Sequence, residues 1–398
     1  MPTAEARRDS RQSVSSRDLR LSSPLVQAFD VVFDNAESIY FAGQKLAGKI
    51  VLEFLDSANV NNILIELRGA AKTYWTKDSG QSRKHYRDSE PYFCEQFNTN
   101  YTNQYRVGKD YPVLTKGNHE IPFSYRLPEN LPSSFEGEFG FVRYTCKVIM
   151  ERPWEPDLIC KRAFTVAGSE NLPEEKTGMA EISASGSTLN FSCCRRRGLT
   201  KVELTLPKSY YVPGEELQAQ MSIVNQGQKA PRSYFLCIQQ HSCYYAKDFS
   251  GKKHKKVVMR EILGDRVPVE EAQELLLVRK LLLPAVPPKL TRCKIIEITY
   301  SCNCQVDQKL SLSIPLTVGS ITPKKLILNS LVEAVKSSEL PQGSQSSVSQ
   351  YSDQNSWSSK ITFKNSIFGE VDIHDGAEKL AFGCSTFVPK YPCLVSSC

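Results

Sequence analysis

The chain has 398 residues, of which 40% are hydrophobic, and a formal net charge of +7. This length predicts about two domains, and the apolar content is sufficient for two cores. The modest positive charge argues against a dedicated nucleic-acid-binding protein and fits occasional contact with acidic surfaces. The sequence contains no apolar run of the ~18 residues that a membrane helix needs, and no secretory signal is expected.

Residues 1–23 are rich in Arg and Ser and are expected to be disordered. Residues 24–168 are predicted to form the first domain. Within it a stretch over 63–68 alternates in character. Ile63, Ile65 and Leu67 alternate with Leu64, Glu66 and Arg68. Such a period of two is typical of a half-buried strand in an antiparallel sheet.

The polar segment 169–177 is predicted to be a linker, and residues 178–320 a second domain. Three alternating stretches, 201–206, 217–223 and 310–318, indicate further strands. Pro315 falls on a polar face and suggests an edge strand or a bulge. Many short strands between Pro/Gly turns favour an all-β fold of two tandem immunoglobulin-like antiparallel β-sandwiches.

Helical signals are scarce. Residues 269–283 could form one helical turn, although their leucines could equally form a strand, and residues 325–335 are a second weak candidate. Residues 321–398 form a Ser/Gln-rich tail that is expected to be mostly disordered, with a more apolar end over 382–398.

One sequence motif occurs twice in the chain. An aromatic residue, a glycine turn, polar residues and an alternating strand follow one another in YFAGQKL at 40–46 and in YVPGEEL at 211–217. The distance between Gly43 and Gly214 is too long for a solenoid of small repeats, but it suits two tandem domains built on one plan. A duplicated β domain points to recognition more than to catalysis.

Catalytic motifs are missing from the sequence: it has no G-x-S-x-G elbow, no P-loop and no H-E-x-x-H. His119 could act as a general base, but a structural role at a strand edge is favoured. We therefore expect no enzyme activity and no cofactor.

Thirteen cysteines, an odd number without regular spacing, predict mostly reduced thiols in a cytosolic protein. Cys302 and Cys304 lie two residues apart and could share a zinc site, and Cys193-Cys194 is a second candidate. Because no second pair stands at finger spacing, the favoured interpretation is buried thiols that pack as apolar groups.

The segment 247–256, KDFSGKKHKK, has the composition of a hairpin tip. Lys252, Lys253, Lys255 and Lys256 either form a solvated loop or contact anionic lipid headgroups or phosphorylated cargo. Both alternatives place these lysines on the surface.

A longer series of motifs resembles the α-arrestins, the arrestin-domain-containing family. In the first domain these motifs are GNHEIPFSYRLP at 117–128, LPSSFEG at 131–137, GFVRY at 140–144 and RPW at 152–154. In the second they are YVPGE at 211–215, PP at 287–288, CKIIEITY at 293–300 and PLTVGS at 315–320. Phe135 and Trp154, within these motifs, are expected in the core.

The resemblance implies a non-enzymatic adaptor. Family members bind membrane-protein cargo and recruit HECT-type ubiquitin ligases through P-P-x-Y motifs in the tail, which dock on WW domains. This sequence has no P-P-x-Y; Pro389 and Tyr391 are the nearest match, and Val388 replaces the first proline. The expected location is the cytoplasm, peripherally at the plasma membrane or endosomes.

Two other functions remain open at this point. A retromer-like vesicle-coat subunit of the Vps26 type shares the two-sandwich plan, and a redox-regulated binding protein would use the thiols. One family member binds thioredoxin through a cysteine of its second domain, but residues 261–286 contain no cysteine here.

Overall fold

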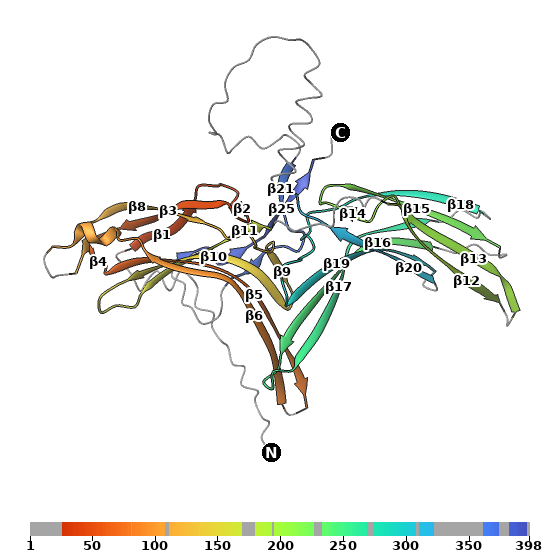
Figure 1. Ribbon diagram of the computed structural model, residues 1–398, viewed down its shortest axis with the longest axis horizontal. Coiled ribbons are helices and arrows are strands. Elements are labelled where there is room, and N and C mark those ends of the chain that lie inside the picture. The colour runs from red at the N-terminus through yellow and green to blue at the C-terminus, as the bar shows by residue number, and fades with distance from the viewer. Residues whose placement is uncertain are drawn as a thin grey trace, which may run out of the picture.

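The computed structural model describes residues 26–80, 82–107, 111–168, 180–192, 195–226, 233–268, 274–307, 310–321, 361–373 and 382–395. Within these ranges the chain forms strands and one 3-10 helix, η1 (Tyr101–Tyr105). Figure 1 shows two β lobes side by side. The predicted all-β fold with two sandwich domains is confirmed.

The first domain consists of two facing sheets. The smaller sheet has the order β1-β3-β8 and the larger one includes β6-β5-β10-β11-β2, with β9 beside β10. Their bounds are β1 (Val26–Phe33), β2 (Ile39–Phe41), β3 (Lys45–Phe54), β5 (Asn62–Ser79), β6 (Ser82–Asn98), β8 (Gly117–Arg126), β9 (Phe135–Gly137), β10 (Gly140–Glu151) and β11 (Leu158–Ala167). A short pair, β4 (Ala58–Asn59) with β7 (Val113–Leu114), closes one end.

The second domain repeats this plan. One sheet has the order β12-β13-β15-β18, and the other contains β14-β20-β19-β16, with β17 beside β16. Their bounds are β12 (Ile182–Ser192), β13 (Arg195–Leu206), β14 (Tyr210–Tyr211), β15 (Glu216–Asn225), β16 (Ser233–Lys247), β17 (Lys253–Pro268), β18 (Glu274–Leu282), β19 (Ile296–Val306) and β20 (Leu310–Val318). The leucine-rich segment after residue 273 is therefore a strand.

Alternating side chains fill both cores as the sequence predicts. On β5, Ile63, Ile65 and Leu67 are fully buried, and on β15 Leu217, Ala219 and Met221 are buried in the same way. Strand β20 pairs with β19 at Pro315, whereas β14 reaches β20 only at residues 317–318, so the proline lies on a one-sided part of the strand.

The repeated motif, YFAGQKL at 40–46 and YVPGEEL at 211–217, folds into the same turn in each domain. Gly43 and Gly214 have positive φ angles of 81° and 85°, a conformation that glycine adopts without steric cost. The next residue stabilises each turn: the side chain of Gln44 accepts a bond from the Phe41 amide at 2.9 Å, and that of Glu215 one from the Val212 amide at 3.1 Å. The aromatic strand before each turn runs parallel to a neighbour, β2 to β11 and β14 to β20. The two domains therefore share this turn and the parallel strand before it, as well as the sequence motif.

The expectation for Trp154 is wrong. Its side chain is 84% exposed, on a backbone with φ 60°, and contacts the ring of Tyr111 at 4.9 Å between centroids. Trp154 lies in the loop between β10 and β11, where Arg152 donates hydrogen bonds to the carbonyl of Pro156. Arg152 holds the loop, and the tryptophan faces outward. Phe135, by contrast, is buried as expected.

Three other expectations fall outside the described residues: the disorder of residues 1–23, the linker 169–177 and the helix candidate 325–335. Two parts of the tail, which is expected to be mostly disordered, are described. Residues 361–373 and 382–395 are ordered and form the strands β21 (Ile361–Asn365), β22 (Val371–Asp372), β23 (Phe382–Gly383), β24 (Thr386–Phe387) and β25 (Lys390–Leu394). These strands pack on the two domains.

Because Phe135 is buried and Trp154 is exposed, their truncations should have opposite consequences. Phe135→Ala should lower the free energy of unfolding by about 3–5 kcal/mol through the cavity it leaves. Trp154→Ala should change it by less than about 0.5 kcal/mol, as for most surface substitutions. Chemical denaturation of both variants checks this, and an equal shift of the two midpoints would contradict the assigned burial.

Candidate binding surfaces: the paired hairpins and the tail

Two long hairpins, one from each domain, project together from the junction between the domains. The β5–β6 hairpin belongs to the first domain and β16–β17 to the second, and Figure 1 shows their tips side by side below the sheets. Lys247 of β16 pairs with Arg87 of β6 in the ladder. We call this projection the keel and define it as residues 74–88 and 245–256, of which residue 81 is not described.

Polar and aromatic contacts hold the two hairpins together. The hydroxyl of Thr73, at the base of the keel, donates to the carbonyl of Tyr245 at 2.7 Å. The rings of Tyr86 and His254 meet edge to face with centroids 4.7 Å apart, and Lys247 lies 3.6 Å from Asp88. The keel is therefore a joint structure of both domains.

The tip of the second hairpin is fixed by Asp248. One carboxylate oxygen accepts hydrogen bonds from the Ser250 hydroxyl at 2.6 Å and from the amides of Ser250 and Lys252 at 2.9 and 3.1 Å. The other lies 2.8 Å from Nε2 of His254. The bonds from Ser250 and His254 hold the pKa of Asp248 well below its usual range. The loop keeps its shape while Phe249 stands 86% exposed at the apex.

The keel is strongly basic. It carries nine Lys and Arg residues and three carboxylates. The cations are Lys77, Arg83, Lys84, Arg87, Lys247, Lys252, Lys253, Lys255 and Lys256. Arg83 and Lys84 were missed from the sequence, because they lie about 165 residues from the lysine run and only the fold brings the two hairpins together.

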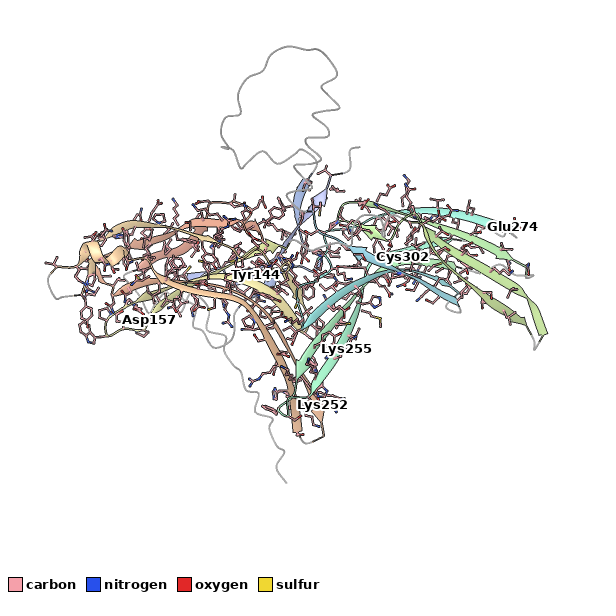
Figure 2. The ribbon with its side chains drawn as sticks, in the orientation of Figure 1. Tyr144, Asp157, Lys252, Lys255, Glu274 and Cys302 are labelled. Atoms are coloured by element: carbon pink, nitrogen blue, oxygen red, sulfur yellow. The ribbon has the colours of Figure 1, made fainter. Side chains whose placement is uncertain are left out.

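The four lysines predicted to meet an anionic surface do not behave alike. Lys252, Lys253 and Lys255 are exposed, and Figure 2 shows Lys252 and Lys255 within the keel. Lys256 is half-buried, and its ammonium lies 3.5 Å from the ring centre of Phe139 in the first domain. Lys256 therefore contributes to the domain junction through a cation–π contact.

The tail strands bind both domains, and Figure 1 shows β21 and β25 on the side of the junction away from the keel. Strands β21 and β25 pair with each other, and β23 runs parallel to β11. On the first domain, the Lys390 amide donates to the hydroxyl of Thr165 at 3.2 Å. On the second, the Leu394 amide donates to the carbonyl of Pro213 at 2.9 Å. The tail thus bridges the two sandwiches.

Tyr391, a candidate partner-binding residue, is buried in this bridge. Its side chain is 3% exposed, and its hydroxyl donates to the carbonyl of Ser134 at 3.1 Å. Burial raises the pKa of Tyr391 well above its usual value. Pro389 precedes β25, and its carbonyl accepts a bond from the Ser366 amide at 2.8 Å. A WW groove cannot grip the tyrosine ring while β25 is docked.

The residues that the sequence suggests for catalysis and metal binding, where they are described, are buried and contact structural neighbours. His119 is 4% exposed on β8, with Nε2 2.8 Å from the Thr115 carbonyl oxygen and Nδ1 3.0 Å from the Tyr101 hydroxyl, so it connects η1 to the sheet. Cys302 and Cys304 are fully buried among core residues. Burial raises the pKa of Cys302 to about 12 and that of Cys304 to about 11, which keeps both thiols protonated. The candidate Cys193-Cys194 lies outside the described residues.

Comparison with known proteins identifies the family. The family model for the arrestin (or S-antigen) N-terminal domain matches residues 29–172, and that for the C-terminal domain matches residues 196–323. Arrestin domain-containing protein 17 of Caenorhabditis elegans is 37% identical over 92% of this chain and 98% of its own length. The chain belongs to the arrestin-domain family, which favours the arrestin alternative over the coat subunit.

Two mammalian relatives are more distant. Human thioredoxin-interacting protein is 23% identical over 74% of this chain and 75% of its own length, and mouse arrestin domain-containing protein 4 is 25% identical over 74% and 72%. A match over 74% of the chain is short enough to lie within the two domains alone. A match over 92% has to extend into the tail, so the similarity to the nematode protein includes at least part of the tail.

The burial of Tyr391 predicts a difference between the intact chain and its isolated tail. The peptide 382–398 should bind WW domains weakly, because Val388 replaces one of the two prolines that the groove grips; Val388→Pro should strengthen binding and Tyr391→Ala should abolish it. The full-length Val388→Pro chain should bind more weakly than the corresponding peptide, because β25 is docked. Calorimetric titration of chain and peptides checks this. Equal affinities would show that β25 detaches freely, and tight binding of the unmodified peptide would show that Val388 is tolerated.

Proposed function

We propose that this protein is a non-enzymatic adaptor that binds membrane-protein cargo and links it to endocytic trafficking and ubiquitination. It would work in the cytoplasm, peripherally at the plasma membrane or endosomes. The observation that supports this most directly is the keel, in which both arrestin domains present one basic surface. Among the described residues, no helix is long and apolar enough to span a membrane.

The keel suits the cytoplasmic face of a membrane on physical grounds. Anionic lipids attract Lys and Arg with about 1 kcal/mol for each residue near the surface. Phe249 projects from the tip among these cations and offers an apolar side chain to the headgroup region, where an aromatic ring is favourable. Cargo segments close to the membrane would meet the same surface.

Direct ligase recruitment through residues 388–391 requires that β25 leave its site. The bridge made by Tyr391 and Leu394 opposes this release. A ligase would therefore reach the complex through a partner protein or after the tail has been displaced. Ubiquitination of cargo remains part of the proposal on the family resemblance.

The lipid part of the proposal is tested with Lys252→Gln, Lys253→Gln and Lys255→Gln combined. Binding to vesicles that contain phosphatidylserine should weaken by about tenfold or more at low salt, and the difference should shrink as salt screens the charges. The matched control is Lys45→Gln, Lys116→Gln and Lys201→Gln, which removes three exposed lysines outside the keel. Equal weakening by both triple variants would show a response to net charge alone.

The cargo part is tested in cells with a photo-crosslinking amino acid at position 249 or, as control, at Leu55, which is also exposed but outside the keel. Position 249 should capture integral membrane proteins that position 55 does not. Surface biotinylation should then show slower removal of the captured proteins when the keel triple variant replaces the parent. Capture of cytosolic proteins alone, or unchanged removal, would count against the adaptor function.

A further inference from the structure

Strand β18 is an edge strand with an unusual solvent face. Among the described strands β15 is its one ladder partner, so its other edge is unpaired there. Leu276, Val278 and Leu282 are 61%, 51% and 52% exposed. Edge strands normally carry charges or prolines that oppose pairing with another chain. Here two cations, Arg279 and Lys280, lie between Val278 and Leu282, and on the exposed face Lys280 is the one that separates them. Its ammonium lies 3.0 Å from the Glu216 carboxylate of β15.

The apolar character of this face is confined to the edge. The β15 residues on the same face, directly beside β18, are Glu216, Gln218, Gln220 and Ser222. The sheet is therefore polar up to its last strand and becomes aliphatic where the backbone is unpaired. This combination favours an added strand over a partner that covers the face of the sheet.

The hydrogen-bond pattern shows which residues offer their backbone groups to such a strand. The Leu283 amide donates to the Glu215 carbonyl at 2.9 Å, so the pair 215/283 is hydrogen-bonded. In an antiparallel ladder bonded pairs recur at every second residue, so 281, 279, 277 and 275 also face β15. The N–H and C=O groups of Leu276, Val278 and Lys280 point to the free edge.

The sequence of β18 is complementary to itself in the antiparallel direction. A two-fold axis through Leu277 places Glu274 opposite Lys280 of a second copy, and Leu276 opposite Val278. Leu276, Val278 and Lys280 are the residues whose backbone groups point to the edge that no described strand covers, so this pairing satisfies backbone, charge and apolar side chains together. A register centred on Val278 would instead place Leu276 opposite Lys280 and Glu274 opposite Leu282.

We propose that two copies of this chain associate through antiparallel pairing of their β18 strands, centred on Leu277. Figure 2 shows Glu274 at the outer end of the second domain, remote from Lys252 and Lys255, so the keel of each copy stays free. One strand pair is a small interface, and the dimer should be weak, with a dissociation constant in the micromolar range, below about 0.1 mM.

Charge exchange at the two ends of β18 tests the register. Glu274→Lys and Lys280→Glu each place two like-charged pairs across the two-fold axis, and each should weaken dimerisation by about tenfold. An equal mixture of the two single variants restores opposite charges at both ends of a heterodimer. The double variant restores them in a homodimer. Both should dimerise like the parent.

The readout is sedimentation equilibrium of the full chain over a range of concentrations. Val278→Glu should abolish the dimer, and Met259→Glu is its control, because Met259 is 67% exposed on β17, which lies beside β16 in the other sheet of the second domain. Thermal denaturation shows whether each variant folds. A parent that is monomeric at about 0.1 mM, in the range expected of small interfaces, would overturn the proposal. Equal loss with Met259→Glu, or no recovery in the mixture, would also overturn it.

Discussion

The left-handed turn at Gly43 and Gly214 is the constraint on which both sandwiches depend. In each domain it leads from a short parallel strand at the end of one sheet, β2 or β14, to a long strand of the other, β3 or β15. A residue with a side chain would be strained there, since both glycines have positive φ angles. At Gly214 a second demand is added: a Cβ atom would lie 2.2 Å from the carbonyl oxygen of Leu394. The glycine that folds the second domain also admits the tail.

A buried ion pair of the first domain, Glu136 with Arg143, lies next to the junction between the domains. Arg143 donates two hydrogen bonds to the Glu136 carboxylate, at 2.7 and 2.9 Å, in a buried site. Burial raises the pKa of Glu136, and the bonds from Arg143 oppose this change. Such a pair adds little net stability, but removing one partner would leave an uncompensated charge. The pair fixes the position of β9. At the end of this strand, Gly137 approaches the second domain so closely that a Cβ atom would lie 2.2 Å from the Tyr244 hydroxyl.

Local alternation was sufficient to predict the strands, and the duplicated turn was sufficient to predict two domains, because both depend on neighbours within a few residues. Trp154 was misplaced because an aromatic residue in a motif can serve a loop held by Arg152 as well as a core. The short strands of the tail were not predicted, for a different reason. Strands of two to five residues carry no periodic signal, and the bond between Tyr391 and Ser134 joins residues 257 positions apart. The keel, too, depends on such a distant pairing.

Three surfaces of the chain lie at separate places: the keel at the junction, the tail strands on the opposite side of the junction, and β18 at the outer end of the second domain (Figure 1). Contacts with both domains hold the keel and the tail, so a rotation of one domain against the other would strain both. The β18 edge belongs to the second domain alone. Association through β18 would therefore leave the junction undisturbed, and where both keels of the dimer reach one membrane, the weak attachment of each would be strengthened by the second. Several weak contacts combined in this way suit a protein that must also dissociate from its partners.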